Sequence, residues 1–104
     1  MPTSASEVGR QASSLRSGLS RPRILVAEDD FIIGKYLGEL VRDAGYIALG
    51  PVTSVGDALR LLQGKGPEAA LLDCTLADGS AAPIAEALAA IDVPFAVFTG
   101  LSGA

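Results

Sequence analysis

Residues 68 to 75 read Glu68-Ala69-Ala70-Leu71-Leu72-Asp73-Cys74-Thr75, and a loop, Leu76-Ala77-Asp78-Gly79, follows them. A short apolar run between Pro67 and a Gly-containing loop is typical of a strand that is buried on both faces of a parallel sheet. Asp73 stands at the carboxyl end of this predicted strand, where open α/β sheets bind their ligands. Asp73 is therefore a candidate for a residue that binds a ligand or takes part in a reaction. The alternative is that it only caps the loop through its own backbone.

A second apolar run also ends on acids. It reads Arg23-Ile24-Leu25-Val26-Ala27-Glu28-Asp29-Asp30. If the two runs are neighbouring parallel strands, Glu28, Asp29 and Asp73 converge at one edge of the sheet. Crowded carboxylates repel one another unless a cation lies among them, and hard oxygen ligands suit Mg²⁺ or Mn²⁺. The cluster therefore predicts a metal. The alternative is a helix cap by Asp29 or Asp30, and both can hold because only one acid can cap.

The composition is that of a single globular domain, with 104 residues of which 49% are hydrophobic and 19% are charged. The net charge of −4 argues against direct binding of nucleic acid. The only cysteine, Cys74, cannot form an internal disulfide, which favours a reducing cytoplasm. It is either a small buried apolar residue or a redox switch beside Asp73. No apolar run is long enough to span a membrane, and the absence of histidine excludes histidine-based catalysis.

The order of elements predicts an α/β fold. Residues 1–22 are rich in Ser, Ala, Gly and Arg and are expected to form a disordered tail, with a transit peptide as the less favoured alternative. Strands are expected at residues 23–27, 46–52, around 69–73 and at 95–98, and helices at 31–44, from Ser54 to before Gly64, and from Pro83 to Ile91. Strands that alternate with helices in this way predict right-handed βαβ units and a doubly wound parallel sheet.

Two details of the expected elements concern packing. In the helix at 31–44, the apolar spacing predicts a buried stripe made of Ile33, Leu37, Leu40, Val41 and Ala44, and Gly45 is expected to end the helix. Gly34 and Gly38 are unusual inside a helix and either permit the close approach of another element or only weaken the helix. Gly50-Pro51 favours an edge position for the strand at 46–52, because proline cannot donate to a neighbouring strand.

With these residues in place, the chain resembles a response regulator receiver domain of bacterial two-component systems, from Arg23 to about Gly103. Three motifs carry the resemblance: residues 24–30, residues 71–79, and Val97-Phe98-Thr99-Gly100. The resemblance implies a flavodoxin-like sheet with the strand order 2-1-3-4. It also implies a cytoplasmic phosphorelay protein that is a signalling domain and not an enzyme.

The resemblance further implies a role for each site residue. Asp73 would accept a phosphoryl group from a histidine kinase or phosphotransfer protein. Asp29 and Asp73 would bind Mg²⁺ directly, the carbonyl of Thr75 would add a ligand, and Glu28 would act through a bound water. Thr99 would hydrogen-bond the phosphoryl oxygens and reposition on activation. A carboxylate can attack a phosphoryl group only where a cation neutralises charge and the groups are held in line.

One departure from the family is expected to matter. The family continues with a fourth helix, a fifth strand ending in Lys-Pro and a fifth helix, whereas this chain ends at Ala104 and is expected to be truncated. Neither Lys35 nor Lys65 can replace the missing lysine. The strand at 95–98 would then be an open apolar edge through which the chain self-associates. The alternative functions are a non-phosphorylated interaction fragment and, less favoured, an Asp-nucleophile phosphatase, for which Thr75 replaces the expected second Asp.

Overall fold

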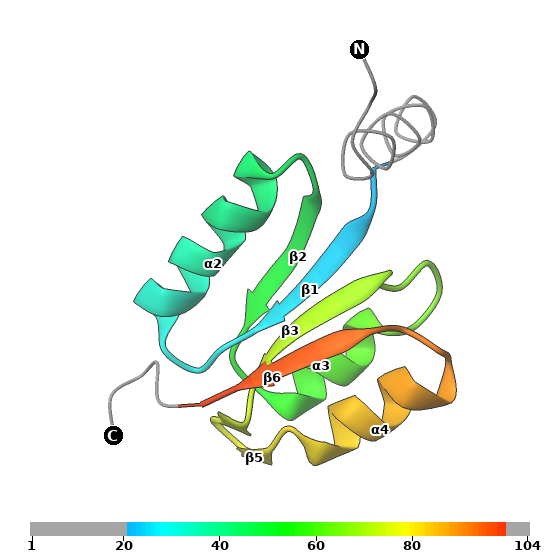
Figure 1. Ribbon diagram of the computed structural model, residues 1–104. Coiled ribbons are helices and arrows are strands. Elements are labelled where there is room, and N and C mark those ends of the chain that lie inside the picture. The colour runs from blue at the N-terminus through cyan, green and yellow to red at the C-terminus, as the bar shows by residue number, and fades with distance from the viewer. Residues whose placement is uncertain (1–20, 100–104) are drawn as a thin grey trace.

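Four parallel strands form one sheet in the computed structural model, which describes residues 21–99 (Figure 1). They are β1 (Arg23–Ala27), β2 (Ile47–Val52), β3 (Ala69–Asp73) and β6 (Phe95–Phe98), in the order β2-β1-β3-β6. All neighbouring pairs are parallel. The predicted order 2-1-3-4 is confirmed, because β6 is the fourth strand of this sheet along the chain. Residues 1–20 of the tail predicted at 1–22, and the segment 100–104, lie outside the described residues.

Helices cover both faces of the sheet (Figure 1). The helix α2 (Phe31–Asp43) lies along β1 and β2 on one face, while α3 (Val55–Leu61) and α4 (Ala82–Ala90) lie on the other. The main core forms between the sheet and the latter two helices. Its buried members are Leu25, Ala27, Ala58, Ala70, Leu72, Leu76, Ala81, Ile84 and Leu88. Alternation along the strands leaves Val26, fully buried, on the α2 face. The expected doubly wound architecture is present.

The glycines of α2 face the sheet. The buried residues of this helix are Gly34, Gly38 and Val41, whereas Leu40 is 46% exposed and Ala44 is exposed. The predicted stripe was therefore wrong at Leu40 and Ala44. A Cβ on Gly34 would lie 2.8 Å from the Cβ of Pro51 in β2. Gly34 thus permits the close approach of β2 to α2, whereas a Cβ on Gly38 would meet the Arg42 side chain of the same helix.

A register shift in β2 depends on Gly50. Leu25 pairs with Leu49, but Ala27 pairs with Val52, so β2 carries an extra residue at this point. Gly50 has a φ of +104°, and a Cβ there would lie 2.6 Å from the carbonyl oxygen of Val26. Only glycine fits this position. β2 is an edge strand, as predicted from Gly50-Pro51.

The connection between β3 and α4 contains a small hairpin that the sequence did not predict. Its antiparallel strands are β4 (Thr75–Leu76) and β5 (Gly79–Ser80). Leu76 is buried in the core and anchors the hairpin. In α4, Ile84 and Leu88 are buried, but Ile91, with which the helix was expected to end, lies beyond the helix and is 53% exposed. Between residues 21 and 99, no helix is long and apolar enough to cross a membrane.

Candidate metal centre

The parallel pairing of β1 with β3 brings the acids together. Ala27 pairs with Leu72, so the residues that follow them, Glu28 just after β1 and Asp73 at the end of β3, lie side by side. Carboxylate oxygens of Glu28, Asp29 and Asp73 all lie within 4.8 Å of one another. The structure therefore assembles these three sequence candidates into one cluster at the carboxyl edge of the sheet.

The helix cap is a different acid. The Oδ1 atom of Asp30 accepts a hydrogen bond of 3.0 Å from the backbone N–H of Ile33 in the first turn of α2. Asp30 has the extended backbone of an N-cap residue. Asp29 is exposed and lies in the cluster. The cap and the acidic cluster predicted as alternatives thus coexist, on neighbouring residues.

Two oxygens of the cluster are buried and lack a hydrogen-bond partner. Glu28 is fully buried and Asp73 is 3% exposed. Glu28 Oε2 accepts a hydrogen bond of 3.2 Å from the backbone N–H of Asp30. No donor within the described part of the chain reaches Glu28 Oε1 or Asp73 Oδ2. Such orphaned acceptors are rare in folded proteins because each costs the free energy of its lost hydration.

The surroundings of Glu28 favour its uncharged form. Burial raises the pKa of the Glu28 carboxyl from 4.5 to about 8, and the neighbouring Asp73 and Asp29 add to the rise, while the N–H of Asp30 opposes it. With an effective dielectric constant of about 20, two unit charges 4.8 Å apart repel by roughly 3.5 kcal/mol. A proton on Glu28 relieves this repulsion, and so would a cation. The donor set is all oxygen, which fits Mg²⁺.

The backbone next to Asp73 is also tied to the site. The N–H of Thr75 donates to Asp73 Oδ1 at 3.4 Å, and Thr75 itself is exposed at the start of β4. Thr99 directly follows β6, whose last residue, Phe98, pairs with Asp73. Thr99 is exposed. The structure thus brings Thr99 to the same edge of the sheet as the acids, and the sequence candidates all lie at this edge.

Asp78 is a residue near the site whose contacts the sequence did not reveal. Its two carboxylate oxygens accept hydrogen bonds from the backbone N–H groups of Val55, at 2.6 Å, and Gly56, at 3.2 Å. These donors lie in the first turn of α3. The Asp78-Gly79 pair signalled only a turn, because nothing in a sequence pattern pairs a loop acid with a helix more than 20 residues earlier.

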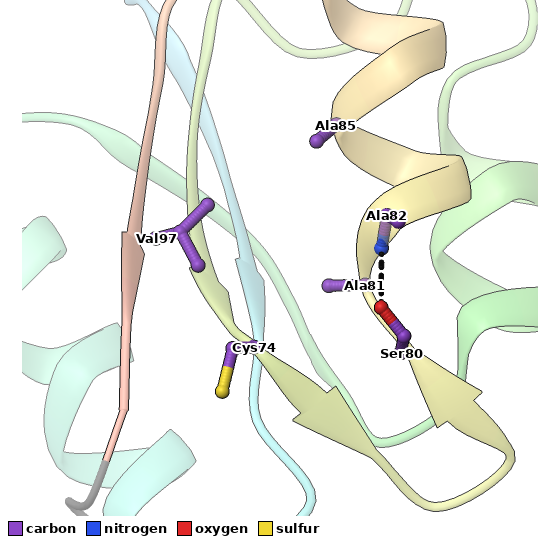
Figure 2. A pocket seen from close by; sticks show the side chains of 6 residues that line it. All are labelled: Cys74, Ser80, Ala81, Ala82, Ala85 and Val97. Carbon is purple, nitrogen blue, oxygen red and sulfur yellow. Dashed lines mark hydrogen bonds between the residues drawn. The ribbon is translucent and has the colours of Figure 1, made fainter.

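Cys74 lies beside Asp73 but on the other side of the strand. Figure 2 shows its side chain among Ser80, Ala81, Ala82, Ala85 and Val97, which line a cavity of about 210 Å³ between the sheet and α4. The thiol is partly buried, and its sulfur lies 3.7 Å from Thr75 Oγ1. Cys74 is therefore partly buried among small side chains, and it lies outside the carboxylate cluster.

Comparison with known proteins gives structural relatives only. No protein-family model and no curated protein matches the chain. The chain is similar to the non-phosphorylated HemR receiver domain from Leptospira biflexa, with 30% identity and a TM-score of 0.69 over 81% of this chain and 68% of HemR. It is also similar to the BeF3-activated SdrG from Pseudomonas melonis Fr1, with 37% identity and a TM-score of 0.61 over 72% of this chain and 64% of SdrG.

A third relative is longer. The response regulator PhyR from Brucella abortus is 28% identical with a TM-score of 0.69, over 92% of this chain but only 42% of PhyR. The chain thus spans less than half of PhyR and about two thirds of the other two proteins.

Proposed function

The chain belongs to the family of response regulator receiver domains, and from this premise we propose that it accepts a phosphoryl group on Asp73 in a two-component phosphorelay. The observation that carries the proposal is the pair of buried, unpartnered oxygens, Glu28 Oε1 and Asp73 Oδ2, in a cluster with Asp29. A structural ion pair or cap would have satisfied these atoms. Their unsatisfied state is the arrangement that a cation site requires.

Four residues would hold Mg²⁺ in this proposal. Asp29 and Asp73 supply carboxylate oxygens, Thr75 supplies its backbone carbonyl, and Glu28 acts through a bound water. The ion, when bound, neutralises charge on the phosphoryl oxygens and on the carboxylates around them. Burial is the main cause of the raised pKa of Glu28 and the nearby acids add to it, so a cation bound here would favour the charged form of Glu28 by offsetting the contribution of those acids.

Asp73 is the nucleophile of the transfer. One of its carboxylate oxygens forms a bond to phosphorus while the bond from phosphorus to the donor's histidine nitrogen breaks, and that nitrogen keeps the bonding pair. The N–H of Thr75 holds Asp73 Oδ1, which restricts rotation of the carboxylate. The exposed Asp29 marks the side from which the donor reaches the otherwise buried acids.

Thr99 would report the product. An aspartyl phosphate adds roughly two negative charges and new acceptor oxygens at the edge where Thr99 stands. Its hydroxyl can donate a hydrogen bond to one of these oxygens. Repositioning of Thr99 would then move the end of β6 and couple the chemistry to a partner surface.

The proposed donor is a histidine kinase or a phosphotransfer protein. Large apolar side chains stand exposed at the start of α2, directly after the acids: Phe31 is 68%, Ile32 79% and Tyr36 59% exposed. Such a patch next to the nucleophile suits a protein partner. The net charge of −4 disfavours nucleic acid, and a single cysteine suits the cytoplasm.

The second candidate is a protein-interaction module of the same fold that is never phosphorylated, since the apolar patch on α2 would serve it equally well. Incubation with acetyl phosphate and Mg²⁺, followed by mass spectrometry, separates the two. We expect one phosphoryl adduct that maps to Asp73 and is absent from Asp73→Asn and from samples with EDTA. An adduct that persists in Asp73→Asn would refute the assignment of the acceptor. No adduct in the unmodified chain would favour the interaction module.

A further inference from the structure

Three hydrogen bonds join the β4–β5 hairpin to the start of α3. Asp78, in the turn of the hairpin, accepts from the N–H groups of Val55 and Gly56, and the N–H of Ala77 donates to the carbonyl of Thr53 at 2.9 Å. The N–H of Val55 lowers the pKa of the Asp78 carboxyl below its usual value, and the N–H of Gly56 adds to this effect. Asp78 is therefore charged when it makes these contacts at neutral pH, and charge-assisted hydrogen bonds are the stronger kind.

The helix does not need Asp78 as its ordinary cap. Ser54 is the N-cap residue of α3, and its hydroxyl accepts from the N–H of Asp57 at 3.1 Å. Asp78 accepts hydrogen bonds from the N–H groups of Val55 and Gly56, to which Ser54 is not bonded. Water could satisfy these exposed groups equally well. The more specific consequence of the contact is that it fixes the hairpin relative to α3.

The hairpin carries the backbone of the proposed metal site. Thr75 pairs with Ser80 across the hairpin, and Leu76 pairs with Gly79. On one side Thr75 is bonded to Asp73 Oδ1, and on the other Leu76 is buried in the core. Asp78 supplies the remaining attachment, at the tip. Without it, the bond between Ala77 and Thr53 is the one other hydrogen bond from the tip to the start of α3 among the described residues, and the orientation of the Thr75 peptide is less restricted.

We propose that Asp78 is a positioning residue, which clamps the hairpin to α3 so that the Thr75 carbonyl is oriented for the metal on which labelling of Asp73 depends. This inference rests on the proposed function. It assigns no contact between Asp78 and the metal or the phosphoryl group. Outer groups that orient metal ligands typically change metal affinity by roughly 10- to 100-fold when they are removed.

The test uses the variants Asp78→Ala and Asp78→Asn with Asp57→Asn as the matched control. Asp57 lies in the same first turn of α3 and, among the described residues, its side chain pairs with Arg60, so the control removes the same charge without touching the hairpin. Mg²⁺ affinity is measured by titration at 10 °C, with far-UV circular dichroism to verify folding. Labelling by acetyl phosphate is measured over a range of Mg²⁺ concentrations.

We expect the Mg²⁺ dissociation constant to rise at least about tenfold in Asp78→Ala. It should rise less in Asp78→Asn, because asparagine keeps one acceptor oxygen. In the control Asp57→Asn it should change less than about twofold. The labelling rate at saturating Mg²⁺ should return close to that of the unmodified chain, because Asp73 is intact. If Asp78→Ala is unfolded at 10 °C, the Mg²⁺ affinity of Asp78→Asn tests the positioning role instead.

Unchanged Mg²⁺ affinity in the folded Asp78 variants would overturn the positioning role and leave the proposed function standing. Equal losses in the Asp78 and Asp57 variants would also overturn it, because they would indicate a general effect on α3. If the unmodified chain neither binds Mg²⁺ nor is labelled, the proposed function fails first, and the positioning role fails with it.

Discussion

Replacing Glu28 by glutamine should stabilise the fold in the absence of metal, although it removes a residue of the proposed site. The folded protein holds the Glu28 pKa at about 8 against a usual value of 4.5. At pH 7 the unfolded chain releases the Glu28 proton whereas the folded chain keeps it. Over roughly 2.5 pKa units, at about 1.4 kcal/mol each, this difference costs the fold about 3 kcal/mol. Glutamine is uncharged in both states and removes the cost.

The stabilisation by Glu28→Gln should increase as the pH rises. A carboxyl whose folded pKa is raised imposes no penalty well below pH 4.5, and the stability of the fold is lost as the pH rises from there towards 8. The advantage of Glu28→Gln should therefore be less than about 1 kcal/mol at pH 5 and about 3 kcal/mol at pH 7. For a domain of this size the latter corresponds to a rise in Tm of roughly 12 to 24 °C.

The assay is thermal unfolding by circular dichroism at pH 5, 6 and 7 in EDTA, repeated with Mg²⁺. Mg²⁺ at about 100 times its Kd should stabilise the unmodified chain by roughly 2.7 kcal/mol and the variant by less, because glutamine brings no charge to the cluster. Glu39→Gln, which removes an exposed carboxylate from α2, is the control and should change neither curve. A Glu28→Gln protein that is less stable in EDTA at pH 7 than the unmodified chain would refute the reasoning.

Three further predictions test the cluster, the helix packing and the sheet edge. Asp29→Ala should weaken Mg²⁺ binding in a titration by at least about tenfold, and an unchanged affinity would refute its role as a ligand. Gly34→Ala should destabilise the fold by about 1–3 kcal/mol in urea unfolding, because the new Cβ meets Pro51, whereas Gly38→Ala meets only a flexible Arg side chain and should stabilise α2 by up to about 1 kcal/mol. Equal effects of the two would contradict the packing described. Val97→Lys, on the exposed edge strand β6, should reduce any concentration-dependent light scattering of the 104-residue chain, and scattering that persists would exclude β6 as the contact.

The central strands β1 and β3 were predictable from the sequence because a strand covered on both faces must be apolar along its whole length, and the edge strand β6 has the same apolar composition. The ranges predicted for β1 and β6 match the structure, and β2 begins one residue later than predicted. The convergence of Glu28 and Asp73 was also predictable, because neighbouring parallel strands have their carboxyl ends at the same edge of the sheet. The roles of Asp73, Thr75 and Thr99 remain proposals, because geometry alone does not show chemistry.

The orientation of α2 could not be derived from hydrophobic spacing. Counting apolar residues placed Leu40 inside, whereas the structure places Gly34 and Gly38 there. When a helix packs through glycines, a hydrophobicity scale does not identify its contact face, because such scales give high values to large apolar side chains and not to glycine. The spacing of four between the two glycines was the available signal. Asp78 was missed for a different reason, because its partners are peptide N–H groups, which every sequence position offers alike.

The bulge in β2 makes Gly50 important for the acidic cluster, although Gly50 has no side chain that could react or bind metal. The extra residue at Gly50 brings the carbonyl of Val52 to within 2.9 Å of the N–H of Glu28, so a backbone irregularity in an edge strand holds the start of the acidic cluster. In a saturation mutagenesis screen scored by phosphorylation, Gly50 should therefore be as intolerant as Asp73, although it contributes no reactive group. Only a parallel screen scored by folding would separate the two, since Gly50 variants should fail both and Asp73 variants only the first.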